Sequence, residues 1–324
     1  MTEQKIEYVK GINSIIEIKP HGNKRTCNRN MLEINPTVGC QFQCQYCNAY
    51  AQTGDNFSEV KVYIDYPQYL KEYLEEHKGE VDRIFFYFSP KIDAFQDCLI
   101  ETGITKAILE ILMEYNARYI IVTKGGVPND EICELLIKSK HLNQFLISCS
   151  MPNEETRILL EPHAASIQER LNFAKYLVDN GIRTTAIFSP ILPINNGEYI
   201  KQYIDYYLSI NITHFRLNYA ELSHDCLNSL INLLPQYAEN LKIYMDNEAE
   251  RTEWQIPYKN AKINRYFPSV MYMHDSFEEL RAYAKNINKD ATFSICNSLC
   301  EKKELSGFNN EAFKAGFGCI GYIW

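Results

Sequence analysis

Short apolar runs alternate with amphipathic segments along the first two thirds of the chain, and this alternation limits the fold more than any other feature. The apolar runs indicate buried strands at residues 31–35, 81–89, 119–123, 142–148, 183–188 and 212–217. Helical spacing occurs between several of them, at residues 104–115, 166–180 and 198–209. Strands buried on both faces and alternating with helices indicate parallel βα units. About six units are too few for a closed eight-stranded barrel, so we expect an α/β fold, a partial (β/α)6 TIM-like barrel.

The alternation ends near residue 225. The remaining residues, 226–324, carry Pro, Asn and aromatic side chains together with several cysteines. We therefore expect a partial barrel with an N-terminal lead-in at residues 1–225 and a small C-terminal extension at residues 226–324. A chain of 324 residues accommodates this arrangement, whereas two full domains would be crowded.

Composition and charge weigh against several classes of function. No stretch approaches the ~20 apolar residues that span a bilayer, and the N-terminus lacks the apolar run of a secretory signal. We therefore expect a cytoplasmic protein with no membrane partner, whose eleven cysteines are core thiols, metal ligands or catalytic groups rather than disulfides. The formal net charge of −8 argues against nucleic acid as a partner, because binding its backbone needs clustered Lys and Arg.

Three cysteines, Cys40, Cys44 and Cys47, follow the first predicted strand within eight residues. This places them on a loop at the end of the sheet where the chemistry of such barrels is found. Three thiolates at this spacing bind three corners of a [4Fe–4S] cluster and leave one iron open. A structural zinc site needs four protein ligands, and a predicted strand separates the nearby candidates, His21 and Cys27, from the loop. Three unrelated buried thiols are the remaining alternative.

A second group of cysteines lies in the C-terminal extension. Cys296 and Cys300 are four residues apart, so on a helix both sulfurs face the same side. Cys319 lies among glycines, which let the backbone approach a bulky group closely. We expect a second [4Fe–4S] cluster here, with packed thiols as one alternative. The candidates for a further ligand are Cys226 and Cys27 for a cluster, and Cys226 and His274 for the alternative of a zinc site.

The spacing Cys-x-x-x-Cys-x-Tyr-Cys resembles the signature of the radical S-adenosylmethionine (SAM) superfamily, with Tyr46 in the aromatic position. Further segments resemble the branch related to spore photoproduct lyase: residues 35–40, 93–96 with Thr105, 122–124, 161–162 with Arg170, and 189–193. The resemblance implies a [4Fe–4S] cluster and SAM as cofactors, and an electron donor such as flavodoxin or ferredoxin. It also implies that reductive cleavage of SAM gives a 5′-deoxyadenosyl radical, which abstracts hydrogen from a substrate.

The resemblance suggests which residues contact SAM. The candidates are Lys124 and Arg170 for the carboxylate, Ser148 for a hydrogen bond, Glu161 for the ribose and Tyr46 for the adenine. Each cation has a structural alternative: Lys124 is a solvated surface residue, and Arg170 is a surface charge or the i,i+4 partner of Ser166. Glu161 is alternatively a capping residue.

Position alone makes Asp93, His214, Arg216 and Tyr219 the catalytic candidates. Asp93 follows the second predicted strand, where active-site residues gather, although a turn-forming Asp is nearly as good an interpretation. His214 and Arg216 are two residues apart on the sixth strand and therefore share a face. Either side chain reaches substrate if that face lines the mouth of the barrel.

One departure from the DNA-repair lyase bears on the substrate. That enzyme carries a hydrogen-donating Cys shortly before the position of Asp93, whereas residues 88–92 contain none here. Cys98 lies just downstream, and we interpret it as a core thiol on a helix. We therefore predict a radical SAM enzyme that acts on a small molecule or a peptide. A lesion-repair lyase and a non-catalytic zinc or iron–sulfur protein are the alternatives, and the identity of the substrate stays open.

Overall fold

The computed structural model describes residues 4–13, 16–20, 31–47, 59–194, 198–246, 252–256, 261–296, 299–301, 303–318 and 321–322. The chain divides into two compact units. Unit 1 comprises residues 1–42, 55–147 and 168–184, and unit 2 comprises residues 43–54, 148–167 and 185–324. In the described part of the chain, no helix has the length and apolar character needed to cross a membrane.

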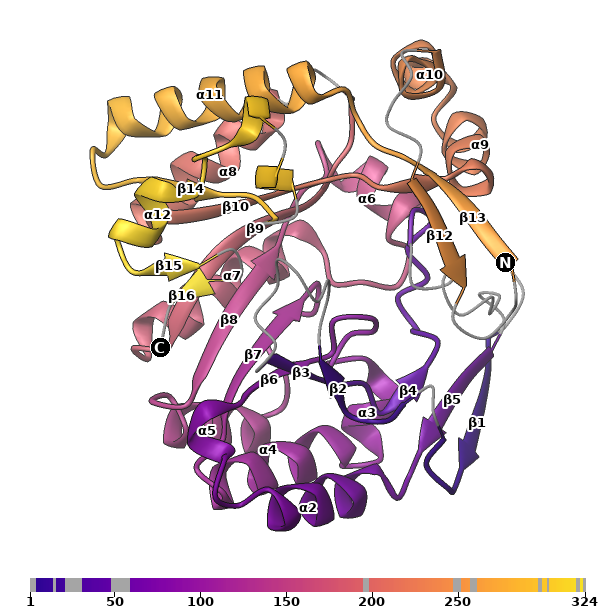
Figure 1. Ribbon diagram of the computed structural model, residues 1–324, viewed down its shortest axis with the longest axis vertical. Helices are drawn as coiled ribbons and strands as arrows, with labels where there is room; N and C mark the ends of the chain where they lie inside the picture. The colour runs from indigo at the N-terminus through magenta and orange to yellow at the C-terminus, as the bar shows by residue number, and fades with distance from the viewer. Residues whose placement is uncertain are drawn as a thin grey trace. The chain divides into compact units, whose positions relative to one another are not determined.

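The main sheet of unit 1 is mostly parallel (Figure 1). In spatial order its strands are β2 (Lys19–Pro20), β3 (Met31–Ile34), β6 (Phe85–Phe88), β7 (Arg118–Thr123) and β8 (Asn143–Ser148). Strands β3, β6, β7 and β8 pair in parallel, and β2 pairs antiparallel with β3. Every residue of β3 and of β8 is buried, as expected of parallel strands covered on both faces.

The helices of unit 1 bury regular apolar stripes. They are α2 (Tyr66–Glu76), α3 (Asp97–Glu101), α4 (Ile104–Glu114), α5 (Asp130–Lys138) and, from its second residue, α7 (Ile167–Asp179). Helix α4 buries Ile104, Ile108 and Leu112 at the four-residue spacing of one helix face, and it packs against both α2 and α5 (Figure 1). Helix α5 begins at Asn129, whose side chain accepts a hydrogen bond from the Ile132 amide at 3.0 Å.

A small sheet of unit 1 holds the start of the cysteine loop, which we define as residues 39–47. Its strands lie in the order β1 (Lys5–Val9), β5 (Glu59–Tyr63) and β4 (Thr37–Val38). Gly39 follows β4 with φ +86°, and a Cβ added there would lie 2.5 Å from the carbonyl oxygen of Glu59. Only glycine combines this backbone conformation with so close an approach, so the residue before Cys40 is constrained twice.

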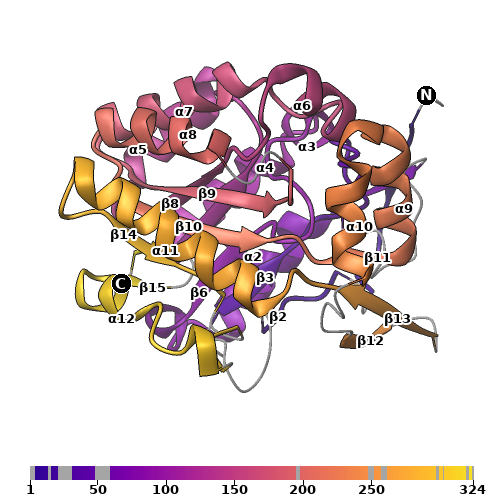
Figure 2. The ribbon, with the colours of Figure 1, turned by 90° about the horizontal axis from the view of Figure 1, so that it is seen from above.

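Unit 2 contains three parallel strands in the order β9 (Arg183–Ile191), β10 (His214–Tyr219) and β14 (Thr292–Ser294). Helices α8 (Glu198–Ser209) and α11 (Val270–Ile287) pack against each other (Figure 2). Both helices cover the same face of the strands: the rings of Tyr203 in α8 and Phe188 in β9 lie 6.3 Å apart, and those of Phe277 in α11 and Phe293 in β14 lie 6.0 Å apart.

The rest of unit 2 is built from short elements. The helices are α6 (Glu154–Leu160), α9 (His224–Leu233), α10 (Ala238–Asp246) and α12 (Asn310–Lys314). An antiparallel sheet has the order β11 (Leu222–Ser223), β13 (Ala261–Tyr266) and β12 (Thr252–Ile256), and β15 (Phe317–Gly318) pairs with β16 (Gly321–Tyr322).

The observed strands match the six that the sequence predicts, namely β3, β6, β7, β8, β9 and β10, and each is followed along the chain by a helix. One boundary differs, because Val81–Arg83 forms a 3₁₀ turn and the strand begins at Phe85. The division at residue 225 stays a prediction. The region after it supplies β14, which pairs with β10, as well as the peripheral elements.

We expect Gly39→Ala to lower the free energy of unfolding by more than about 2 kcal/mol, because it adds a clash with Glu59 to the strain of a left-handed backbone. The matched control is Gly11→Ala: Gly11 has φ +89° but no heavy atom within 4 Å of the added Cβ, so it tests the backbone term alone. Urea unfolding curves measure both variants. Equal losses would show that the contact with Glu59 is unimportant.

Candidate active site

The three cysteines of the cysteine loop differ in exposure. Cys44 and Cys47 are half-buried, and the amide of Cys47 donates to the carbonyl of Cys44 at 3.0 Å, which closes a turn. Cys40 is 9% exposed, whereas Cys98 and Cys149 are 0% and 1% exposed. Three thiols on one irregular loop, two of them open to solvent, form a donor set that fits an iron–sulfur cluster.

The start of the cysteine loop is held by side-chain amides in unit 1. The Gln96 side chain accepts a hydrogen bond from the Gln41 amide at 3.0 Å and donates one to Thr37 Oγ1 at 3.1 Å. The Gln41 side chain in turn accepts from the Cys98 amide at 2.6 Å. The segment that follows β6 therefore orients the backbone next to Cys40. The sequence does not reveal the roles of Gln41 and Gln96, because an isolated Gln carries no signal of its partner.

Asp93 lies at the centre of a further network in unit 1. Its Oδ1 accepts from Thr123 Oγ1 at 2.8 Å and from the Phe95 amide at 3.0 Å, and its Oδ2 accepts from the Lys124 amide at 2.8 Å. Burial raises the pKa of the Asp93 carboxyl, while the same hydrogen bonds oppose the rise. Asp93 therefore stabilises the turn in which it lies, which agrees with its turn-forming interpretation. It also fixes the turn that carries Lys124, whose side chain is half-buried.

The second half of the cysteine loop contacts α6 within unit 2. The Tyr46 hydroxyl donates to Glu161 Oε1, and the Gln45 amide donates to the carbonyl of Leu160 at 2.8 Å. Both Tyr46 and Glu161 are buried. Two residues predicted to contact SAM are therefore hydrogen-bonded to each other, and the loop is joined to the end of α6 beside them.

Arg157 secures the segment that contains Glu161. Its Nη1 donates to the carbonyls of Glu161 and Ala164 at 2.8 and 2.9 Å, and its Nε donates to Glu154 Oε1 at 2.7 Å. The side chain is 7% exposed, so these bonds satisfy a charge that has little water around it. Sequence reasoning missed Arg157, since an Arg near a helix end usually indicates a solvated charge.

Two other residues predicted to contact SAM are Arg170 and Ser148. Arg170 on α7 is fully buried, which removes the alternative of a surface charge. Ser148 ends β8, and its hydroxyl donates to the carbonyl of Ser189 at 3.0 Å, so it is left to act as an acceptor. The roles of these residues toward SAM stay predictions.

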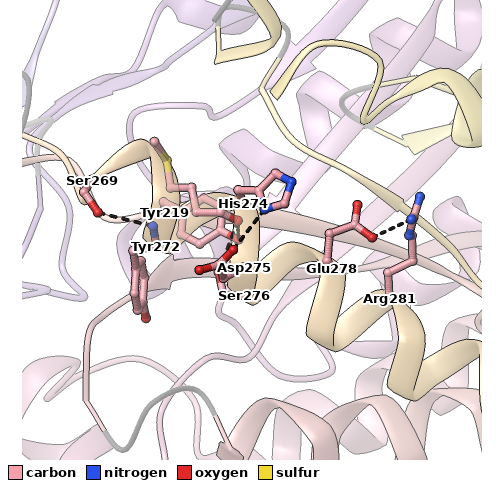
Figure 3. Close-up of polar contacts among 9 residues, drawn as sticks. Tyr219, Ser269, Tyr272, His274, Asp275, Ser276, Glu278 and Arg281 are labelled. Carbon is pink, nitrogen blue, oxygen red and sulfur yellow. Dashed lines mark hydrogen bonds and ion pairs between the residues drawn. The ribbon is translucent and has the colours of Figure 1, made fainter. Parts of the chain in front are cut away.

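Two of the catalytic candidates make structural contacts. The hydroxyl of Tyr219 donates to the carbonyl of Met273 at 2.9 Å and lies 2.7 Å from Ser276 Oγ, so it joins β10 to α11 (Figure 3). His214 is 1% exposed, and its two ring nitrogens contact the hydroxyls of Thr292 and Ser294 at 2.9 and 3.0 Å. Burial, aided by the charge of Arg216, lowers the pKa of His214 to about 3, so its ring is neutral near pH 7.

The buried Cys98 thiol is a poor hydrogen donor for a substrate. It lies on α3 with no exposed surface, and burial raises its pKa to about 12. The core interpretation of this residue therefore agrees with its surroundings.

The second cysteine group is described only in part. Cys296 and Cys300 are half-buried, and the Leu299 amide donates to the carbonyl of Cys296 at 2.9 Å. Cys319 and Cys27 lie outside the described residues. Among the residues that the structure describes, no three His, Cys, Asp or Glu side chains are grouped so as to hold a metal ion. That finding concerns a single ion, whose ligands converge on one point, whereas cluster thiolates bind separate irons.

Comparisons with known proteins agree with this geometry. Residues 34–207, more than half of the chain, match the family model described as the radical SAM superfamily. An uncharacterized protein of Methanocaldococcus jannaschii is 28% identical over 202 residues, which cover 58% of this chain and 73% of that protein. The spore photoproduct lyase of Clostridium acetobutylicum is 24% identical over 290 residues, which cover 85% of this chain and 78% of the lyase.

A solved structure extends the likeness to the fold. A spore photoproduct lyase complexed with a dinucleoside spore photoproduct superimposes with a TM-score of 0.61 and 16% identity, over 88% of this chain and 81% of that one. At this identity the likeness concerns the fold alone. The predicted α/β class, an open partial barrel, is confirmed.

Cysteine labelling tests the contrast in exposure. At pH 8 roughly one Cys98 thiol in ten thousand is ionised, given its pKa of about 12, so we expect iodoacetamide to leave it unmodified in the native protein. The half-buried Cys226 on α9 is the internal comparison and should be alkylated. Peptide mass spectrometry follows both sites, with a sample in urea as the control in which both react. Labelling of Cys98 as fast as Cys226 would contradict the core assignment.

Proposed function

The chain belongs to the radical SAM superfamily, and from this we propose that it cleaves SAM reductively and abstracts hydrogen from a small molecule or a peptide. SAM cleavage is general to the family, and the chain is an enzyme of this class. The observation that carries the proposal is the cysteine loop, whose three thiols lie on a backbone held by Gln41, Gln96 and the end of α6.

The residues of the chain would divide the work as follows. Cys40, Cys44 and Cys47 would hold the [4Fe–4S] cluster, which when bound supplies the electron for SAM cleavage. The hydroxyl of Tyr46 and the carboxylate of Glu161 restrain each other, which keeps the cysteine loop and the end of α6 together before SAM binds.

Asp93 would act on the cation beside it. Because it fixes the amide of Lys124 and the hydroxyl of Thr123, it sets the direction in which the Lys124 side chain leaves the strand. We assign Lys124 and Arg170 to the SAM carboxylate, the first from its place after β7 and the second from its complete burial.

The substrate class rests on charge and on the thiols. The net charge of −8 does not favour contact with a nucleic-acid backbone. Residues 88–92 contain no Cys, and the nearby Cys98 is buried with a raised pKa. These features support a small molecule or a peptide over a DNA lesion as the substrate.

The proposed reaction needs an electron donor, and the cysteines bear on the cellular location. We propose a flavodoxin or ferredoxin as electron donor and the cytoplasm as location, where eleven cysteines remain reduced. A second [4Fe–4S] cluster on Cys296, Cys300 and Cys319 stays a prediction, supported by the partial exposure of Cys296 and Cys300.

We expect the anaerobically reconstituted protein to form 5′-deoxyadenosine from SAM when dithionite is added, as measured by liquid chromatography. Cys44→Ala should abolish this product, because one thiolate ligand of the first cluster is lost, and should lower the brown absorption by about half, because the predicted second cluster remains. Cys133→Ala is the matched control, since Cys133 is 6% exposed on α5 with its thiol directed at the carbonyl of Pro128.

Retention of the product and of the full absorption in Cys44→Ala would refute the assignment of the cluster ligands. A wild-type protein that carries the cluster and forms no 5′-deoxyadenosine would refute the enzymatic proposal. Conversion of a dinucleoside spore photoproduct by the same preparation would overturn the substrate class alone.

Iron content tests the second cluster. We expect about eight irons per chain in the reconstituted wild type and about four in a Cys296→Ala/Cys300→Ala variant, since each [4Fe–4S] cluster carries four. About four irons in both proteins would exclude the second cluster while leaving the first untouched.

A further inference from the structure

The three strands of unit 2 have one apolar face and one polar face. Phe215 and Leu217 of β10 are fully buried, and Phe215 stacks on Phe188 with ring centroids 6.1 Å apart, on the side that α8 and α11 cover. Side chains alternate along a strand, so His214, Arg216 and Asn218 point to the opposite side. That side we call the polar face.

The neighbouring strands continue this face with uncharged residues, among them the apolar Ile187, and the ring of Phe317 in β15 stacks on that of His214 with centroids 4.2 Å apart. Thr292 and Ser294 of β14 contact the ring of His214, and Asn218 Nδ2 donates to Ser189 Oγ of β9 at 2.8 Å. In the parallel register Arg216 lies opposite Ser294 on one side and Ile187 on the other. Strands β9, β10 and β14 contain no acidic residue.

Arg216 is a buried cation with no hydrogen-bond or ion-pair partner among the described residues. Its side chain belongs to a residue only 9% exposed, and its Nε and Nη1 are buried with no hydrogen bond. Among the residues that the structure describes, none forms an ion pair or a hydrogen bond with its guanidinium. Thr185 Oγ1, one pleat earlier on the polar face of β9, is likewise buried and unbonded.

A buried guanidinium without hydrogen-bond partners is unfavourable unless a ligand supplies the missing acceptors. Buried guanidinium groups are normally paired, because the loss of hydration outweighs what an uncharged environment returns. The same unit shows the normal case: Arg157, 7% exposed, donates to two carbonyls and a carboxylate. His214 cannot compensate Arg216, because its ring is neutral and both nitrogens are engaged.

We propose that the polar face of unit 2 binds a carboxylate group of the substrate, and that Arg216 is the residue that pairs with it. A carboxylate is the anion that suits this site, since the guanidinium of Arg216 carries one positive charge and a carboxylate carries one negative charge. The planar guanidinium also matches a carboxylate through two parallel hydrogen bonds. The unbonded hydroxyl of Thr185 provides a further donor on the same face.

The proposal rests on the proposed function in one respect, namely that the carboxylate belongs to the substrate of a radical SAM enzyme. SAM itself has a carboxylate, but Lys124 and Arg170 are already assigned to it. Within the class of small molecules and peptides, the inference selects those with a free carboxylate.

Thermal unfolding of the full chain, with its cluster reconstituted, tests the unpaired charge. Arg216→Met keeps the length of the side chain and removes the charge, so we expect Tm to rise by about 2 °C or more. Arg157→Met is the matched control and should lower Tm, because it leaves the carbonyls of Glu161 and Ala164 without their donor. A lower Tm for Arg216→Met would overturn the proposal.

Acetate serves as the probe for the anion. We expect sodium acetate to raise the Tm of the wild type relative to sodium chloride at equal ionic strength, because a ligand that binds only the folded state stabilises it. The rise should be absent from Arg216→Met and present in Arg157→Met. Equal rises in wild type and Arg216→Met, or no rise in the wild type, would overturn the proposal.

Two further measurements separate the alternatives. A rise in Tm with inorganic phosphate and none with acetate would replace the carboxylate by a phosphoryl group and so overturn the stated class. A tenfold weaker SAM affinity of Arg216→Met in equilibrium dialysis would place the SAM carboxylate on Arg216 and overturn the assignment to substrate. None of these readouts needs SAM cleavage, so a failure of the proposed enzymatic function is recognised separately, by the absence of 5′-deoxyadenosine.

Discussion

The buried carboxylate of Asp93 is the interaction on which the ordering of the loops in unit 1 depends. A carboxylate removed from water is retained only where donors surround it, and its pKa lies above the ordinary value because of that burial. The donors come from Thr123 and Lys124 after β7 and from the Phe95 amide after β6. One residue further, Gln96 carries the network to Thr37 and Gln41 in the segment that leads to and through Cys40. One polar network therefore sets the ends of two strands and the start of the cysteine loop.

In unit 2, the two faces of strands β9, β10 and β14 have different roles. The aromatic residues that face α8 and α11 supply the apolar burial that holds β9, β10 and β14 together. The opposite face carries polar side chains. On that face His214 joins β10 to β14, because its ring contacts two hydroxyls of β14. Stability and ligand binding are in this way divided between the two faces of one set of strands.

The sequence predicts the strands that are long and apolar, and it fails where the signal is short or lies in a distant partner. Strand β14 has three residues, Thr292–Ser294, with one aromatic side chain, so no periodicity marks it. The roles of His214 and Tyr219 depend on groups more than fifty residues away, which position on a strand cannot reveal. The sequence leaves two interpretations of Asp93 open for the same reason. The family motifs, by contrast, are local in sequence, so the spacing of the three cysteines alone is enough to predict a cluster site on the cysteine loop.

Arg216 and Arg157 differ in how their buried charges are satisfied. Both are arginines of unit 2 with similar exposure, yet one donates to three acceptors and the other to none among the described residues. The strands beside Arg216 contain no Asp or Glu, the residues that form ion pairs with buried arginines. An acidic neighbour would satisfy the guanidinium permanently and close it to any ligand. A binding site for a carboxylate needs the opposite, namely a guanidinium whose neighbours are uncharged and leave its hydrogen-bond donors available to the ligand. The free-energy cost of burying that charge is then offset by the aromatic residues packed on the other face of the same strands.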